Sequence, residues 1–327
     1  MIRRPRNALA LVCGVSLAWA QAAPEQYSPA FLSSPAFQTS DLPDGPAGSL
    51  VVFSHGAEAV PIRLPFPARH VVYSPDGKSL YAQPMPLGAC LYKIEFNPTR
   101  SKPVACPPGL QFQGVAVSRS EDRLLFSGRY GSDGNLFCGV FEILLPGGTI
   151  RPVLKASCPG EPWDSLSYSP DGKRAVGVVA KAIGLFAKSR EAASPFPPSS
   201  VVVIELDSGA ARSIGSGFLP ASWSPDGRWI AAVQNGGGSK TVLFDATSFA
   251  KVKTLPGSEA EWSPDSRYLL RVDPCANETG TVEAVSVDSG EGKPILSSRC
   301  KVYNVSTGWV SDSILPQNPG GQGADPK

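Results

Sequence analysis

Histidine is scarce in this sequence, and the cysteines do not fall in metal-binding spacings. The 327 residues include two histidines, His55 and His70, and none of the seven cysteines belongs to a CxxC or CxxH pair. Zinc and most transition-metal sites are built from clusters of these side chains. The shortage therefore predicts a protein without a bound metal or cofactor.

A nucleophile elbow of the Gly-x-Ser-x-Gly type is missing as well, which removes the usual signature of a serine hydrolase. The sequence therefore predicts no catalytic residue. Charge of one sign is also lacking. The 30 lysines and arginines include three arginines near the N-terminus, so 27 remain elsewhere against 28 acidic residues. Such a balance gives no electrostatic reason to expect nucleic acid as a partner.

The N-terminus has the three-part pattern of a secretory signal peptide. Arg3, Arg4 and Arg6 precede an apolar run at 8–20, and small residues follow at the cleavage spacing. We expect cleavage after Ala22 and a periplasmic or secreted mature chain. The run of thirteen residues is shorter than the roughly 20 that span a bilayer. No later segment is apolar enough to cross a membrane, so no membrane span is predicted.

One phrase recurs along the chain: YSPDGK begins at 73 and 168, WSPDGR at 223 and WSPDSR at 262. In such a phrase serine accepts a hydrogen bond, proline presets φ near −65°, and glycine takes the left-handed conformation that closes a hairpin. Apolar, strand-like residues stand on both sides. Each phrase is therefore expected to join two strands, with its aspartate bonded to the backbone of the turn.

The spacing of these turns predicts the architecture. Degenerate copies at 117–128 and 306–316 complete a series beginning at 74, 118, 169, 224, 263 and about 310. The intervals of 39 to 55 residues match the period of a propeller blade, a four-stranded sheet repeated around an axis. We expect an all-β protein, a six-bladed β-propeller of four-stranded antiparallel blades.

The last blade lacks its outer two strands at the C-terminal end, because the tail 316–327 is too polar to supply them. Two strand-like stretches near the N-terminus, 49–54 and 59–65, have no repeat phrase of their own. We expect them to form the outer two strands of the last blade and so close the ring. The predicted organisation is a signal peptide at 1–22, a flexible leader at 23–48, a propeller at 49–315 and a disordered tail at 316–327.

The repeated aromatic-Ser-Pro-Asp-Gly phrase resembles the WD-like repeat of TolB-type six-bladed propellers. The resemblance covers about 49 to 315 and implies the same fold. It is weak for function, because the shared residues build a turn. TolB carries an additional N-terminal α/β domain, for which residues 23–48 are too few.

Six cysteines remain after the signal peptide, and an even number in an exported chain indicates disulfides. Cys90 and Cys106 are centred on residue 98, and Cys138 and Cys158 on Gly148, both within turns. Each pair therefore faces across an outer hairpin, which predicts disulfides 90–106 and 138–158. We expect Cys275, from a loop, to pair with Cys300 at the end of a strand, although their midpoint lies ahead of the evident turn at 288–290.

Two functions fit these observations. The first is a binding scaffold for a protein or peptide in the cell envelope or outside the cell, expected to act as a monomer. The alternative is a propeller hydrolase or lyase that acts on a sugar, lactone or glycan. That alternative requires carboxylates such as Asp164, Glu261 and Asp273 to converge.

The binding surface is expected on the face opposite the Ser-Pro-Asp-Gly turns. We call these two faces the loop face and the turn face. A long insertion at 180–200 belongs to the loop face and carries three large apolar side chains beside basic residues. Aromatic anchors with basic neighbours suit a protein interface. The residues predicted for this face are Arg69, His70, Arg129, Tyr130, Trp163, Asp164, Leu185, Phe186 and Phe196.

Overall fold

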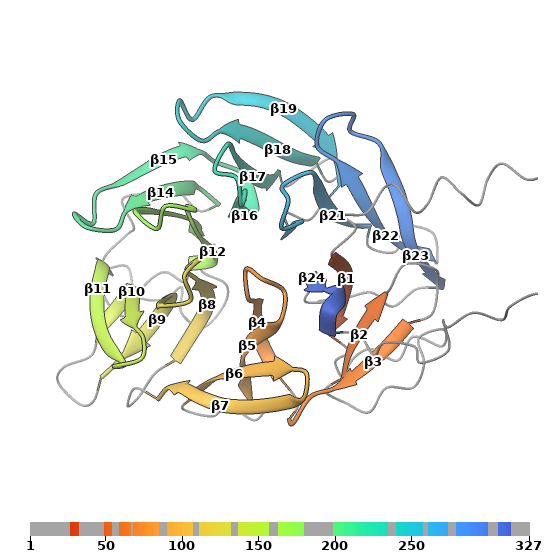
Figure 1. Ribbon diagram of the computed structural model, residues 1–327. Helices are drawn as coiled ribbons and strands as arrows, with labels where there is room; N and C mark the ends of the chain where they lie inside the picture. Colours follow the sequence, from red (N-terminus) through yellow and green to blue (C-terminus); the bar gives the residue numbers. More distant parts are fainter. Residues whose placement is uncertain are drawn as a thin grey trace, which may run out of the picture.

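The computed structural model consists of six four-stranded antiparallel sheets arranged around a central axis (Figure 1). It describes residues 27–32, 49–53, 59–66, 68–84, 90–106, 111–131, 137–156, 163–179, 199–234, 240–257, 261–273, 279–299 and 307–314. Each sheet is one blade, and in five of the six its first strand in chain order lies nearest the axis. The predicted all-β, six-bladed propeller is confirmed.

The strands follow one another from the axis outward in five of the six blades. Blade 1 holds β4 (Ala68–Tyr73), β5 (Ser79–Pro84), β6 (Leu91–Phe96) and β7 (Thr99–Ala105), and blade 2 holds β8 (Gln111–Val117), β9 (Arg123–Tyr130), β10 (Phe137–Leu144) and β11 (Thr149–Ala156). Blade 3 holds β12 (Trp163–Tyr168), β13 (Arg174–Val179), β14 (Val201–Glu205) and β15 (Ala211–Gly215). Blade 4 holds β16 (Phe218–Trp223), β17 (Trp229–Gln234), β18 (Lys240–Asp245) and β19 (Lys251–Pro256). Blade 5 holds β20 (Glu261–Trp262), β21 (Tyr268–Asp273), β22 (Thr279–Ser286) and β23 (Gly292–Arg299).

The repeated phrase forms the turn between the first two strands of a blade. In blade 1, the Ser74 hydroxyl donates to Asp76 Oδ1 at 2.7 Å and accepts from the Ser79 amide at 3.0 Å. The Asp76 carboxylate also accepts the Lys78 amide at 3.0 Å, and Gly77 has φ of +66°. The aspartates at 171, 226 and 265 make equivalent bonds. Their predicted role in the turn is confirmed.

Two turns adopt the left-handed conformation without glycine. Glu121 has φ of +55° and Ser266 has φ of +63°, at the position that glycine takes elsewhere. Both side chains bond to a neighbouring blade. Glu121 accepts from Tyr81 Oη at 2.7 Å and pairs with Lys93, while Ser266 Oγ accepts the Asp226 amide at 2.9 Å. The strained positions therefore serve as ties between blades.

The hydrophobic core lies between neighbouring blades. One cluster joins Val176 and Val203 of blade 3 to Trp223 and Phe244 of blade 4. Blades are covered on both faces, and the central strands are accordingly apolar at successive positions. In β14, residues 201–204 are at most 3% exposed. Helices long and apolar enough to span a membrane are absent from the described residues.

The sixth blade contains both ends of the folded chain. Its order is β24 (Thr307–Ser311), β1 (Tyr27–Leu32), β2 (Ser49–Phe53) and β3 (Ala59–Arg63), counted from the axis (Figure 1). Ser28 Oγ donates to Asp312 Oδ1 at 2.6 Å, and the Ser311 amide donates to the Gly77 carbonyl of blade 1 at 2.9 Å. Closure of the ring by N-terminal strands is confirmed.

The number of closing strands was predicted wrongly. Three strands come from the N-terminus, because β1 lies between β24 and β2 within the segment predicted to be a flexible leader. Conversely, the predicted strand–turn–strand at 306–316 is β24 followed by a 3-10 helix, η2 (Asp312–Ile314). The second position of this blade is occupied by β1, and η2 therefore adds no strand there.

One predicted disulfide is present between Cys90 and Cys106, whose Cα atoms are 4.1 Å apart. Cys138 is also disulfide-bonded. Its predicted partner Cys158, and the pair Cys275 and Cys300, lie outside the described residues.

Candidate functional site

A hollow of 240 Å³ lies on the propeller axis at the turn face, and we call it the axial hollow. Its wall includes a residue from the first strand of every blade, two positions before the serine of the turn or its counterpart. These residues are Val72, Ala116, Ser167, Ser222, Glu261 and Trp309. The wall is mixed in character, since blades 6, 1 and 2 contribute tryptophan, valine and alanine, and blades 3, 4 and 5 contribute two serines and one carboxylate. The hollow can therefore accept a group that is partly apolar and partly polar.

In five blades, the residue after the turn serine stands at the mouth of the axial hollow. In four blades this residue is a proline, at positions 75, 170, 225 and 264. Proline has no amide to donate, so these positions present rigid apolar surface. Blade 2 carries Arg119 instead.

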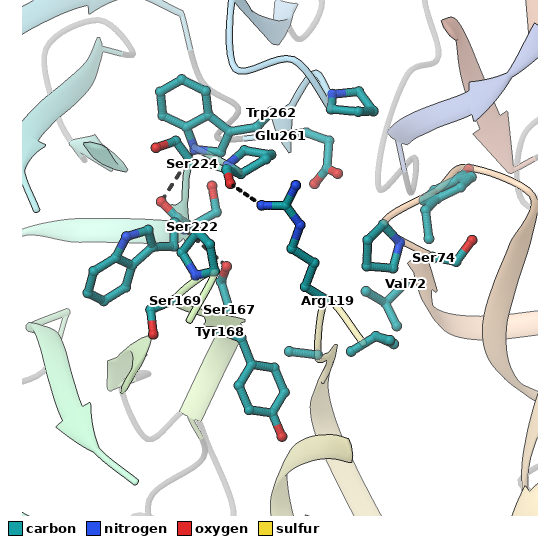
Figure 2. Close-up of a pocket in the computed structure, with 18 of the residues that line it drawn as sticks. Val72, Ser74, Arg119, Ser167, Tyr168, Ser169, Ser222, Ser224, Glu261 and Trp262 are labelled. Carbon is teal, nitrogen blue, oxygen red and sulfur yellow. Dashed lines mark hydrogen bonds between the residues drawn. The ribbon is translucent and has the colours of Figure 1, made fainter. Parts of the chain in front are cut away.

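The Arg119 side chain is exposed and extends across the mouth (Figure 2). Its Nη1 donates to the Pro225 carbonyl at 3.2 Å, from blade 2 to blade 4. Glu261 and Trp262 lie on the far side of the hollow in the same view. A guanidinium and a carboxylate thus share a space that is otherwise bounded by apolar side chains and serines.

Tyr73 and Tyr168 contribute to the wall in different ways. Burial raises the pKa of Tyr73, and the charge of Glu261 raises it further, so the phenol stays protonated and remains a donor. The Tyr168 ring points away from the hollow, and its hydroxyl donates to Glu142 Oε1 at 3.1 Å (Figure 2). Tyr168 therefore belongs to the wall through its backbone region and to the inter-blade contact through its hydroxyl.

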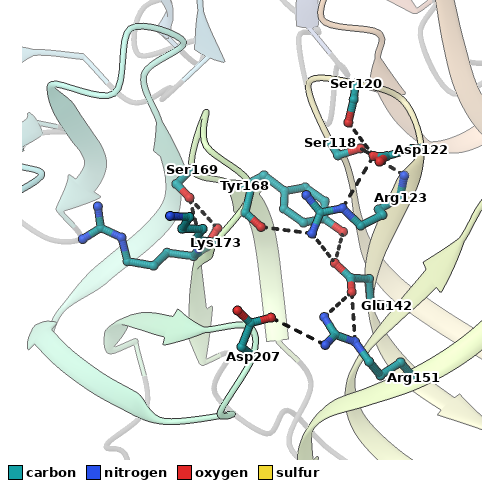
Figure 3. Close-up of polar contacts among 12 residues, drawn as sticks. Ser118, Ser120, Asp122, Arg123, Glu142, Arg151, Tyr168, Ser169, Lys173 and Asp207 are labelled. Atoms are coloured by element: carbon teal, nitrogen blue, oxygen red, sulfur yellow. Dashed lines mark hydrogen bonds and ion pairs between the residues drawn. The ribbon is translucent and has the colours of Figure 1, made fainter.

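A second polar cluster is built around Glu142, which is 0% exposed (Figure 3). Its carboxylate accepts from Arg151 Nε at 3.1 Å, from Arg123 Nη1 at 3.4 Å and from the Tyr168 hydroxyl. Burial raises the pKa of Tyr168, and the charge of Glu142 raises it further. Arg123 Nη1 also donates to the Gly172 carbonyl at 3.0 Å. The carboxylate is enclosed and fully bonded, so this cluster joins blade 2 to blade 3 and is no site for a substrate.

The residues predicted for the loop face lie where their strands end away from the turns. Arg69 and His70 are at the start of β4, Arg129 and Tyr130 at the end of β9, and Trp163 and Asp164 at the start of β12. Leu185, Phe186 and Phe196 lie outside the described residues.

Three of these side chains differ in their exposure and so in their availability to a partner. Arg129 is exposed, whereas Trp163 is 4% exposed and packs with Leu166 and Ala116 between blades 2 and 3. Trp163 is thus a core residue, because successive side chains of the inner strand β12 point alternately toward the two neighbouring blades. Tyr130 is half-buried and stacks on Phe137 with ring centroids 5.4 Å apart.

The carboxylates considered for catalysis do not gather at one place. Glu261 lies beside a turn and pairs with Leu270, whereas Asp273 is three residues farther along β21. At roughly 3.3 Å per residue, about 10 Å of strand separates the two levels. Asp164 lies near the start of β12, again away from the turns. Within the described residues, no group of three or more metal-ligating side chains occurs.

Arg119 and Glu142 were not among the predicted site residues. Arg119 could have been found by aligning the repeats, since it replaces the proline of four other turns. Glu142 could have been noticed as the single charge in the apolar stretch LFCGVFEILL at 136–145. Which partner each side chain meets depends on the neighbouring blade, and sequence spacing does not give that.

No family model matches the chain, and no curated protein sequence matches it either. Solved structures do match in fold. TolB from Acinetobacter baumannii aligns with a TM-score of 0.60 at 14% identity, over 87% of this chain and 66% of TolB. The chain thus spans slightly less than two thirds of the length of TolB.

Two other structures are also similar. A chain of a nidogen/laminin complex gives a TM-score of 0.57 at 10% identity, over 87% of this chain and 98% of its own length. An oligogalacturonate lyase from Vibrio parahaemolyticus gives 0.51 at 10% identity, over 76% and 70%. Likeness at such low identity shows a shared β-propeller fold and carries no function with it.

Proposed function

We propose that this protein is an exported β-propeller that binds a protein or peptide in the cell envelope or outside the cell. The observation that carries the proposal is the axial hollow, whose wall joins rigid prolines, tryptophans and one exposed arginine. Tryptophan and arginine are the residues most enriched at the energetic centres of protein interfaces. A small hollow of this kind suits a side chain projecting from a partner.

Export is supported by two independent features. The N-terminal sequence has the basic, apolar and small-residue parts of a signal peptide. The Cys90–Cys106 disulfide is typical of proteins that fold in an oxidising compartment. N-terminal sequencing of the mature protein should therefore begin at Ala23.

Partner binding can be tested by site-specific photo-cross-linking in the source cells. A photoreactive residue at Val72 reports on the axial hollow, and one at Arg129 reports on the loop face. The control position is Val252 on the outer strand β19, which is 55% exposed. We expect a discrete adduct from Val72 or Arg129 and none from Val252. Equal capture at all three positions, or no adduct at any of them, would contradict a specific binding surface.

The loop face remains a predicted contribution to binding. Its insertion at 180–200 can be shortened by replacing 182–197 with a Gly-Ser linker. If this face contributes, the adduct from Arg129 should weaken while thermal stability is unchanged. An adduct that persists at full strength would remove the insertion from the binding surface.

A further inference from the structure

The arginine at the mouth of the axial hollow is not needed by the turn that carries it. In blade 2, the Ser118 hydroxyl donates to Asp122 Oδ1 at 2.8 Å and accepts the Arg123 amide at 3.0 Å. The bond to the Arg123 amide matches that of the other turns. Asp122 takes the place of their aspartate although it lies four residues after the serine and not two, so the turn forms without proline or glycine. Asp312, the second exception to proline at this position, accepts a bond from Ser28 and so fastens β1. Among the described residues, Arg119 makes no comparable structural bond beyond the Pro225 carbonyl.

Most of the hydrogen-bonding capacity of Arg119 is unused by that contact. A guanidinium has five N–H donors, and a neutral carbonyl at 3.2 Å engages one of them. A carboxylate would engage two in a charge-assisted, bidentate pair, which is stronger than a bond to a neutral acceptor. Arg119 is exposed, so this exchange requires no opening of the core.

Three more residues of the wall carry buried hydrogen-bond donors. Among the described residues, Tyr73 Oη, Trp223 Nε1 and Trp309 Nε1 have no hydrogen-bond partner. The hydroxyl of Ser167 already accepts the Trp223 amide at 3.0 Å, and Glu261 has an interaction of its own. The three unpartnered donor atoms are buried, so a donor that a ligand in the hollow can reach is the exposed Arg119 guanidinium, which favours a ligand that offers an acceptor.

Size restricts that ligand further. The hollow of 240 Å³ is smaller than the roughly 300–1,000 Å³ of pockets that hold drug-sized molecules. It suits one residue of a peptide. Glu261 also lies in the wall, and its carboxylate would repel a ligand that carries more than one negative charge.

We propose that the axial hollow is a carboxylate site, in which Arg119 binds the single carboxylate of an inserted peptide residue and the proline and tryptophan walls hold its apolar part. The carboxylate comes either from the C-terminus of the partner or from an acidic side chain. The ligand class rests on the proposed peptide binding. The assignment of Arg119 as the residue that binds the carboxylate rests on the position and exposure of its side chain.

Three small probes test the site by calorimetry or ligand-observed NMR. N-acetylphenylalanine carries a C-terminal carboxylate, N-acetylphenylalaninamide is its neutral counterpart, and N-acetylglutamate α-amide carries a side-chain carboxylate. We expect at least one acid to bind about tenfold or more tightly than the neutral amide. The better acid identifies the source of the carboxylate. Equal binding of all three probes, or no binding of any, would overturn the proposal.

Variants of the full-length protein assign the effect to Arg119. R119Q should abolish the preference for the acid, and E261Q should strengthen acid binding by removing a like charge. R228Q is the matched control, because Arg228 is exposed in the equivalent turn of blade 4 outside the wall. R119Q and R119K must retain the thermal transition of the unsubstituted protein, and R119K should recover part of the preference. If the R119Q protein binds the acids as tightly as the unsubstituted protein does, the proposed carboxylate site is wrong.

The proposed function and the carboxylate site fail separately. If the R119Q protein is cross-linked to a partner as efficiently as the unsubstituted protein, the protein-binding function stands and Arg119 is not part of the binding surface. Absence of any positional adduct, with the probes still bound through Arg119, would leave a small-molecule carboxylate site and remove the protein-binding function.

Discussion

Gly77 shows how a turn residue can serve two purposes at once. It has φ of +66°, and a Cβ added there would lie 2.6 Å from the Ser311 amide nitrogen of the closing strand β24. Gly227 occupies the same place in blade 4 with φ of +79°, but its added Cβ would come no closer than 3.5 Å to Pro170. The first glycine is required for conformation and for space, and the second for conformation alone.

Replacing each glycine with alanine should separate these effects. Gly227→Ala is expected to lower the free energy of unfolding by about 1 kcal/mol, through the left-handed conformation. Gly77→Ala should lose a further 1–3 kcal/mol or so, because backbone must move to relieve the overlap. Urea unfolding of the two variants measures the difference. Equal losses would show that the contact with β24 is not tight.

The turn aspartates should make stability depend on acid. The hydrogen bond from Ser169 Oγ lowers the pKa of Asp171, desolvation opposes the shift, and the Lys173 amide lowers the pKa further. A carboxyl whose pKa is lower in the folded state stabilises the fold above its unfolded pKa of about 3.9. That contribution is lost as pH falls through the folded pKa.

Thermal unfolding between pH 6 and pH 2 should therefore show a decline in stability below about pH 4. The Asp171→Asn protein lacks one titrating turn, so its decline should be shallower than that of the unsubstituted protein. Asp207 is 92% exposed in its side chain and supplies the control substitution. Parallel curves for all three proteins would contradict a role of Asp171 in acid sensitivity.

Strand β1 is the element whose position was least visible in the sequence. It lies between β24 and β2, yet it contains Pro29, which pairs with Trp309. Proline donates no ladder hydrogen bond and argues against a central strand. The repeat, turn chemistry and blade number could be read from the sequence, because each depends on local residue types. The occupant of the second position in blade 6 depends on a contact between the two ends of the chain.

Removal of β1 should open the ring. A protein lacking residues 27–32 loses the pairing with both β24 and β2, as well as the bond from Ser28 to Asp312. We expect its thermal transition to shift to a lower temperature and to broaden, since blade 6 no longer joins blades 5 and 1. Removal of 318–327 is the control and should change neither property. A sharp, unshifted transition after loss of β1 would contradict closure by this strand.

At the scale of the whole molecule, the blades are joined by polar ties as well as by apolar contacts. Glu142 is fully buried, and its loss would leave Arg123 and Arg151 without their shared carboxylate. Removing one partner of a buried ion pair typically costs about 3–5 kcal/mol, and because the Arg123 and Arg151 side chains are 25% and 39% exposed, the cost here should lie toward the lower end of that range. Glu142→Gln should therefore lower the free energy of unfolding strongly.

Glu95 provides the matched control, since its pair with Lys102 is exposed, with side-chain exposures of 49% and 64%. Exposed pairs contribute about 0–1 kcal/mol. Glu95→Gln should have little effect in the same denaturation experiment. If the two substitutions had equal effects, the Glu142 cluster would not be holding blades 2 and 3 together.

The meeting of both chain ends in one blade also fixes when the protein can finish folding. Ser28 and its partner Asp312 are 284 residues apart. Until residues 307–311 have been made and have reached the same compartment as β1, β1 has no inner neighbour, and the chain carries an unpaired strand edge. The last strand made is therefore the one that removes that edge.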